Sequence, residues 1–441
     1  RSTLACEMRS RLLWRRSTTA AGLYAAVVFG LLGTIVAANV LGLAEFGVFA
    51  TALAAASFFQ TLLDLTVEDS LTKFGFRYVS REEWGKLRRL FRRALELKLA
   101  GGAVAGLALV VLSRFADDVF DTSGLQAALL AVAALPLAQA PENVAGTALL
   151  LRGRYDVRGA YLALSMALRL AAIAVGVHFG VWQALALVVV AQAASTATVS
   201  LVGRSALRRF PSSPPVSLGE DRRPIVSFVL GSSLATGVVS LRTTLAPLVL
   251  GVVAGTNAVG LFRVAQAPQS GLTAATAPVR LVLLTEHTRE WERGRESAVM
   301  AAVRAYTTRA AALMAVAVPL FFVLMPWLVR TFFRDDAYEA AITAARIVLF
   351  AGAIQVILGW SKSLPTTIGR PRLRVITHGV EAVVLLPLVA VLGAEWGVTG
   401  AAVGVLLSAV AFAATWAVLL VGVRADVRGR RDGVVEGVSL P

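Results

Sequence analysis

Charged side chains inside long apolar segments are the residues of this sequence most able to do chemistry. Arg169 lies in the middle of the stretch ALSMALRLAAIAVG, and no residue three or four positions away is a carboxylate. A guanidinium group stays charged and binds phosphate through two parallel hydrogen bonds. Arg169 therefore predicts a site for an anionic ligand. The alternatives are a buried acid on another helix or a cluster of backbone carbonyls.

Three further arginines fall inside apolar segments, and we predict that they line a cationic, substrate-binding cavity together with Arg169. They are Arg242, Arg263 and Arg346. The structural alternative for Arg263 and Arg346 is that their side chains extend to the lipid headgroups, whereas Arg242 could do the same or bind backbone carbonyls.

Acidic residues inside the apolar segments are fewer, and they are the candidates for coupling transport to H⁺ or Na⁺. The candidates are Glu142, Glu381 and Asp64. Each has a structural alternative: a structural or ion-pair role for Glu142, pairing of Glu381 with His378 or with a basic residue of the inner loops, and contact of Asp64 with Lys73 or Arg77. No cofactor is predicted, because the chain has no phosphate-binding GxxxxGK[ST] motif and its three histidines lack metal-ligand spacing.

The composition indicates that these charged residues lie in a membrane protein. The chain has 441 residues, of which 57% are hydrophobic and 16% charged, and its mean hydropathy is +0.72. Soluble domains carry about 25% charged residues. We predict an all-α integral membrane protein with twelve spans, each near the length that crosses a bilayer, at 17–41, 46–68, 94–113, 124–150, 159–179, 184–203, 225–250, 258–281, 308–328, 339–360, 375–392 and 398–423.

The basic residues predict the orientation of these spans. Most of the 43 Lys and Arg residues fall in segments on the side of the N-terminus, whereas the opposite loops hold only Arg114, Arg330 and Arg334. Basic loops remain in the cytoplasm, so both termini are predicted to be cytoplasmic in a multi-pass protein of the cell (inner) membrane. The net charge of +16 is therefore mainly a topology signal. Anionic membrane lipids are predicted partners, and nucleic acid is not.

Two similar halves are predicted on either side of a linker at 204–224, the only stretch rich in Pro, Ser and charge. The predicted parts are a basic N-terminus (1–16), six-helix bundles at 17–203 and 225–423, and a tail (424–441). Matching positions recur at offsets of 213 to 217, and an even number of spans in each half makes this a parallel repeat. The matches are Gly42/Gly255, Gly47/Gly260, Phe49/Phe262, Ala52/Ala265, Gly153-Arg154/Gly369-Arg370 and Gly180-Val181/Gly397-Val398.

Several of these turns resemble the Wzx-type polysaccharide flippases of the multidrug/oligosaccharidyl-lipid/polysaccharide exporter (MOP) superfamily. The similar segments are LGLAEFGVFA (41–50), LLDLTVEDSLTKF (62–74), LVLGVVAGTNAVGLFRVAQA (248–267), IGRPRLR (368–374) and GAEWGVTGAAVG (393–404). The chain has Thr66 where the family commonly has Gly, and Thr243-Thr244 where many members carry Asp. The resemblance implies a MATE-like fold and a flippase that moves polyprenyl-diphosphate-linked oligosaccharide to the outer leaflet for cell-surface polysaccharide synthesis. Glycan polymerase and glycosyltransferases are the implied partners.

Three alternative functions are considered. An ion-coupled multidrug exporter of the same superfamily needs a committed intramembrane carboxylate, for which Glu142 is the candidate. A membrane glycan ligase or polymerase usually has a large outer loop, and none is predicted here. A lipid II flippase typically has extra C-terminal spans, and none is predicted after the twelfth span here. The sequence thus favours a secondary transporter, not an enzyme, that alternates access around a cationic cavity between two bundles.

Overall fold

The computed structural model describes residues 2–63, 66–275, 287, 290–291, 293–368, 370 and 372–436, and among these residues it contains α- and 3-10 helices but no strand. The described chain divides into two compact units, Arg1–Leu261 with Phe333–Ala337 and Phe262–Phe332 with Tyr338–Pro441. The predicted linker 204–224 lies inside the first unit.

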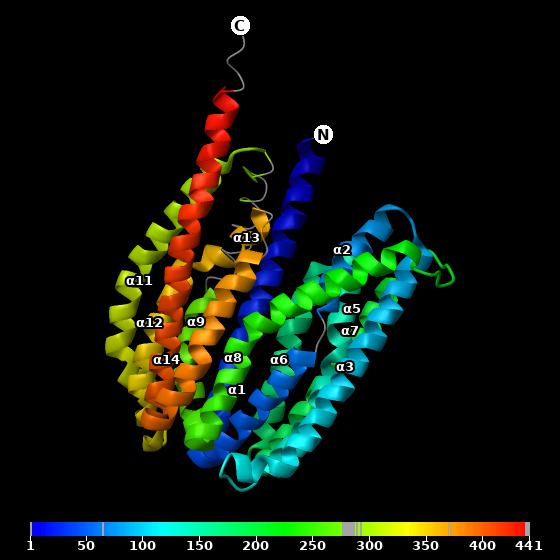
Figure 1. Cartoon of the computed structure of the whole chain (residues 1–441). Helices are drawn as coiled ribbons and strands as arrows, with labels where there is room; N and C mark the ends of the chain where they lie inside the picture. The colour runs from blue at the N-terminus through cyan, green and yellow to red at the C-terminus, as the bar shows by residue number, and fades with distance from the viewer. Residues whose placement is uncertain are drawn as a thin grey trace. The chain divides into compact units, whose positions relative to one another are not determined.

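The first unit contains seven α-helices, a short 3-10 helix and most of an eighth α-helix (Figure 1). Within it α6 packs along α1, and α5, α6 and α7 pack against one another. The elements are α1 (Ser2–Leu63), α2 (Val67–Ser80), α3 (Trp84–Val119), α4 (Leu125–Val132), α5 (Leu135–Leu151), α6 (Tyr155–Gly176), α7 (Val181–Arg208), η1 (Gly219–Asp221) and α8 (Arg222–Ala265), of which α8 ends in the second unit.

In the second unit α12 packs against α9, α11 and α14 (Figure 1). Its buried aromatic cluster includes Trp360, Phe412 and Trp416. The elements are α9 (Ala267–Ala275), α11 (Glu296–Phe332), η2 (Asp336–Ala340), α12 (Ala341–Ile357), η3 (Gly359–Lys362), α13 (Leu364–Thr367) and α14 (Arg372–Glu436).

Nine helices in the described part of the chain are long and apolar enough to cross a membrane. Their outward faces carry large apolar side chains, such as Leu107, Val190 and Val418 (73% exposed). Helices satisfy their backbone hydrogen bonds internally, so such faces are stable in hydrocarbon. The predicted all-α membrane class is confirmed. The nine helices are Ala21–Leu63, Trp84–Val119, Leu125–Leu151, Asp156–Gly176, Val181–Arg208, Thr243–Thr273, Glu296–Phe332, Asp336–Ile357 and Arg372–Val423.

Three of these helices each cover two predicted spans, and each contains a glycine with positive φ at the predicted turn. The φ angles are 70° at Gly42, 79° at Gly255 and 56° at Gly397. Residues with a Cβ atom rarely adopt this conformation, so glycine allows the chain to leave the helical path there. The total of twelve crossings and the cytoplasmic termini stay predictions.

The two turns that match at an offset of 213 touch each other. A Cβ atom at position 47 would overlap the carbonyl oxygen of Thr256, and one at Gly260 would lie 3.2 Å from the Cα atom of Gly47. Glycine lets the two backbones approach this closely. Gly47 and Gly260 are equivalent positions in the proposed repeat, and contact between equivalent residues is typical of a two-fold relation.

We expect Gly47→Val to destabilise the first unit by about 1–3 kcal/mol, because the added atoms force the two turns apart. The readout is the midpoint of thermal unfolding in detergent. Gly30→Ala is the matched control, since a Cβ at Gly30 meets no atom within 4 Å, and it should leave the midpoint unchanged or raise it. An unchanged midpoint for Gly47→Val would show that the turns do not pack this tightly.

The linker between the predicted halves is docked onto the turn between α2 and α3. Phe210 stacks on Trp84 with ring centroids 5.4 Å apart, and the Val216 N–H donates to the Gly85 carbonyl at 3.2 Å. Asp221, the last residue of η1, accepts a hydrogen bond from the Tyr78 hydroxyl at 3.1 Å and pairs with Lys86 at 3.3 Å. The linker is therefore an ordered strap on the first unit.

Acid should loosen this strap. Partial burial opposes the charged form of Asp221, but hydrogen bonds from Lys86 and Tyr78 and the nearby Arg77 hold the pKa of its carboxyl below the ordinary value. Its contribution to stability is therefore complete above the unfolded pKa, about 3.9, and is lost as the pH falls through the lower folded pKa.

Proteolysis measures this loosening. Residues 210–218 should resist a protease at neutral pH and become cleavable under acid conditions by an acid-active protease. Asp221→Asn should give the same cleavage at neutral pH, whereas Glu220→Gln, at an exposed neighbouring position, should not. Equal cleavage of the two variants would remove Asp221 from this role.

Candidate functional site

A buried polar cluster lies where α5, α6 and α7 pack together, and Glu142 is its acidic member. The Gln192 amide donates to Glu142 Oε2 at 2.8 Å and to Thr196 Oγ1 at 3.0 Å. Gln192 and Thr196 share one face of α7 because they are four residues apart. Pro141 directly precedes Glu142 inside α5, and a proline in a helix removes one backbone hydrogen bond and bends its axis.

Tyr161 of α6 completes this cluster. Its side chain is 7% exposed, and its hydroxyl lacks a well-aligned hydrogen-bond partner among the described residues. The hydroxyls of Ser165 and Ser195 lie nearby and are 3.3 Å from each other. The Glu142 carboxylate and the hydroxyl of Thr196 also lie close to the Tyr161 hydroxyl, so this cluster offers several oxygen atoms to a proton, an ion or water. We call Glu142, Tyr161, Gln192 and Thr196 the Glu142 cluster.

Arg169 lies on α6, one turn beyond Ser165. Its side chain is half-buried and has an interaction partner in the structure. Because α6 begins at Tyr155, Arg169 is about 20 Å along the helix, roughly one turn past its centre. The predicted span 159–179 placed it at the centre. The arginine nevertheless remains well inside a membrane-spanning helix.

The next predicted site residues are Arg242, Asp64 and Arg263. Arg242 belongs to α8, and its side chain lies outside the described residues, as does the whole of Asp64. Arg263 is in the last turn of α8 and is exposed. The structure therefore does not test whether the four arginines share one cavity, and this grouping stays a prediction.

Arg346 has a specific structural contact in the second unit. Its Nε donates to the Phe322 carbonyl at 3.0 Å, and its guanidinium lies 4.5 Å from the centre of the Phe322 ring. Pro326, four residues later in α11, has no N–H to donate to that carbonyl. Arg346 thus supplies the hydrogen bond that the proline removes. A substrate-binding role for Arg346 stays a prediction beside this structural one.

An ion pair between a buried lysine and a half-buried glutamate, missed by the sequence analysis, joins α2 and α3. Lys98 Nζ lies 2.7 Å from Glu68 Oε2, and the Lys98 side chain is 2% exposed. The Asn143 amide donates to the other Glu68 oxygen at 3.5 Å. Glu96, two residues before Lys98 on the same helix, pairs with Arg92 and Arg93. The partner at position 68 is on another helix, so no local spacing could identify it.

In the second unit, Glu381 pairs with His378, one of the two kinds of partner that the sequence allowed for it. His378 Nδ1 is 3.0 Å from Glu381 Oε2, and both side chains are buried. The His378 ring stacks on Phe412 with centroids 5.1 Å apart. The spacing of three residues on one helix made this pair visible in the sequence. An ion-coupling role for Glu381 stays a prediction.

Comparison with solved structures identifies the fold. An inward-facing multidrug resistance MATE family transporter of the MOP superfamily matches with a TM-score of 0.68 and 13% identity, covering 94% of this chain and 96% of the other. A mutant of the Vibrio cholerae MATE transporter VcmN matches with 0.65 and 13% over 96% and 98%. The lipid II flippase MurJ in an inward closed conformation matches with 0.67 and 11% over 92% and 87%. At these identities the matches show a common fold.

Comparison of sequences identifies the family. No curated protein matches the chain significantly. A family model described as "Polysaccharide biosynthesis protein" matches residues 16–280, which is more than half of the chain and includes the Glu142 cluster, Arg169 and Lys98. This multi-pass membrane protein, whose described residues include nine helices long and apolar enough to cross a membrane, therefore belongs to the polysaccharide biosynthesis protein family.

Proposed function

We propose that the protein is a secondary transporter that flips a polyprenyl-diphosphate-linked oligosaccharide from the cytoplasmic to the outer leaflet. The observation that carries the proposal is Arg169, a cation well inside a membrane-spanning helix of a chain in the polysaccharide biosynthesis family. A charge at that depth is expensive and usually functional. The diphosphate of a lipid-linked glycan is the anion that such a family must carry through the membrane.

The proposed mechanism is alternating access of two six-helix halves related by the internal repeat. The diphosphate would be neutralised during passage by Arg169, Arg242, Arg263 and Arg346. Arg346 would then exchange its contact with Phe322 for one with the diphosphate. The Glu142 cluster would bind the coupling ion, H⁺ or Na⁺, in the first half. Its buried tyrosine hydroxyl and carboxylate lie next to each other, so protonation of Glu142 would change the hydrogen bonding between α5, α6 and α7.

Orientation is part of this proposal, and a cysteine at Ser212 tests it. The position is exposed and lies in the linker that we propose faces the cytoplasm. In a Cys6→Ser background, Ser212→Cys should resist a membrane-impermeant maleimide in intact cells and react after permeabilisation. Rapid labelling of intact cells would reverse the topology and, with it, the assigned direction of transport.

The activity is tested with purified protein in vesicles. A short fluorescent glycan on polyprenyl diphosphate is incorporated, and a membrane-impermeant glycosidase or quencher reports the fraction in the outer leaflet. Protein should accelerate the exchange, and Glu142→Gln should change its dependence on a pH gradient. A glycan polymerase and glycosyltransferases are the proposed functional partners in the cell.

A second candidate function is an ion-coupled exporter of small molecules. The observation that favours it is the Glu142 cluster, because such an exporter needs a committed acid inside the membrane. Proton-dependent efflux of a cationic dye that persists in Arg169→Ala and is lost in Glu142→Gln would support this candidate. Glycan flipping that requires Arg169 would exclude it as the main activity.

A further inference from the structure

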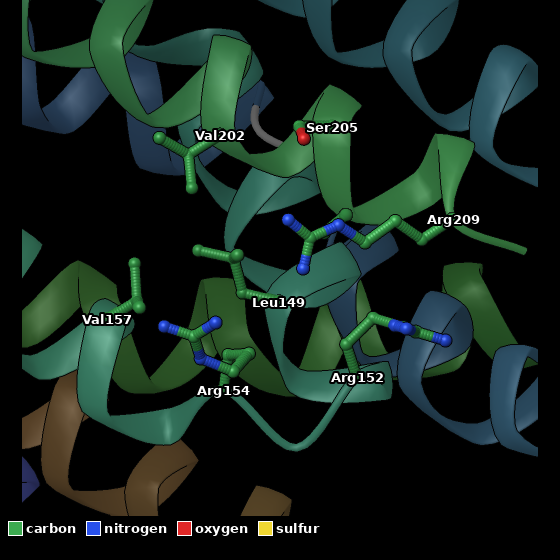
Figure 2. A pocket seen from close by; sticks show the side chains of 8 residues that line it. Leu149, Arg152, Arg154, Val157, Val202, Ser205 and Arg209 are labelled. Atoms are coloured by element: carbon green, nitrogen blue, oxygen red, sulfur yellow. The ribbon is translucent and has the colours of Figure 1, made fainter.

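A basic pocket lies at the end of the first unit where α5 ends, α6 begins and α7 ends (Figure 2). Its volume is about 130 Å³, enough for one small anionic group, and three arginines line it from two different segments. Figure 2 shows the Arg209 side chain extending toward Leu149 and Ser205, whereas the Arg152 guanidinium group points away from Arg154 and Arg209. Arg152 and Arg154 come from the turn between α5 and α6, and Arg209 directly follows α7. Ser205, Val157 and Val202 also line the pocket.

The charges of this pocket are not balanced by the described part of the chain. Arg154 pairs with Asp156 at 3.3 Å, and Arg152 lies over the Phe210 ring, 5.0 Å from its centre. Stacking on an aromatic face leaves the edge of a guanidinium group available for hydrogen bonds. Three guanidinium groups against one carboxylate give a net positive pocket. An anion that accepts several N–H bonds is the ligand that such a pocket favours.

The surroundings of the pocket show that its ligand has an apolar part. Val202 is 40% exposed and Leu201, beside it on α7, is 70% exposed. These residues belong to a helix that is apolar enough to cross the membrane. The arginines therefore lie where the apolar face of α7 ends, which is the depth of lipid headgroups. Basic pockets between helices on the cytoplasmic side suit anionic headgroups.

We propose that this pocket binds the phosphate group of an anionic phospholipid, whose acyl chains lie along the exposed face of α7. Arg154, Arg209 and Ser205 hold the phosphate, Arg152 adds positive charge beside it, and Leu201 and Val202 contact the chains. This site belongs to the first unit alone and is separate from the residues proposed to contact the transported glycan. It fixes the end of α7 beside the strap that begins at Phe210.

Native mass spectrometry of the full chain in detergent tests the proposal with phosphatidylglycerol as the probe. The triple variant Arg152→Gln/Arg154→Gln/Arg209→Gln should bind it more weakly, by about fivefold for each arginine if each contributes about 1 kcal/mol. The matched control is Arg204→Gln/Arg208→Gln, because both residues are exposed near the end of α7 and neither lines the pocket. The control should bind like the wild type.

Three further measurements separate the sources of the phosphate. Phosphatidylcholine should bind equally to all variants, and inorganic phosphate at the same concentration should not displace phosphatidylglycerol. If the triple variant is unstable, Arg209→Gln alone replaces it and should show about a fivefold loss. Equal lipid binding by the triple variant and the control overturns the proposal. Loss of polyprenyl diphosphate binding with unchanged phosphatidylglycerol binding also overturns it, and would assign the pocket to substrate.

Discussion

Replacing Glu68 by alanine should destabilise the protein by about 3–5 kcal/mol, because removal of one partner leaves the other charge buried without compensation. Lys98 is 2% exposed and lies 2.7 Å from the Glu68 carboxylate, in a stretch of α3 that is apolar enough to cross the membrane. The measurement is the thermal unfolding midpoint in detergent, together with the yield of monodisperse protein.

Two matched variants separate this effect from a general loss of charge. Glu96→Ala removes a carboxylate from the same helix as Lys98, but its arginine partners are exposed, so the midpoint should change much less. The double variant Glu68→Met/Lys98→Met should recover most of the lost stability, since apolar side chains replace a buried pair well. If Glu68→Ala and Glu96→Ala behave alike, the buried ion pair does not stabilise the fold.

Replacing Arg169 by alanine should slow glycan flipping by about 10- to 100-fold, because a hydrogen bond to a charged group contributes roughly 1.5–3 kcal/mol. Arg169→Lys should retain part of the rate, since the charge survives and the two-pronged geometry does not. Flipping is measured in vesicles at matched protein density. Leu168→Ala is the control, because this neighbour is exposed on the outer face of α6.

Arg169 has a partner within the protein, so loss of activity alone would not separate binding from structure. Binding of a soluble isoprenoid diphosphate supplies that separation. The account expects weaker diphosphate binding with an unchanged unfolding midpoint in Arg169→Ala. A lowered midpoint with unchanged binding would make Arg169 a structural residue.

The sequence could predict those features whose determinants are local. Apolar length defined the membrane helices, and glycines at 42, 255 and 397 marked points where the chain leaves the helix. The sequence could suggest the His378–Glu381 pair because side chains three residues apart on a helix are neighbours. The family could also be recognised from the sequence, because its glycine-rich turns recur in a constant order.

Contacts between distant segments could not be predicted in this way. Lys98 finds Glu68 on another helix, and Arg346 reaches a carbonyl that Pro326 leaves unpaired on a neighbouring helix. The composition of 204–224 predicts a linker but not where it docks, and Phe210 and Asp221 attach it to α3 and α2. Each of these contacts depends on packing that brings remote residues together.

Transbilayer movement of a defined lipid-linked glycan by the purified protein tests the central claim most directly. Vesicles carry a polyprenyl-diphosphate oligosaccharide in both leaflets, and an impermeant glycosidase removes the outer pool. The account predicts that wild-type protein returns the protected glycan to the enzyme, that Arg169→Ala does so at least about tenfold more slowly, and that Leu168→Ala matches the wild type. Full protection of the inner pool by active, monodisperse protein, together with ion-driven efflux of a cationic dye, would contradict it.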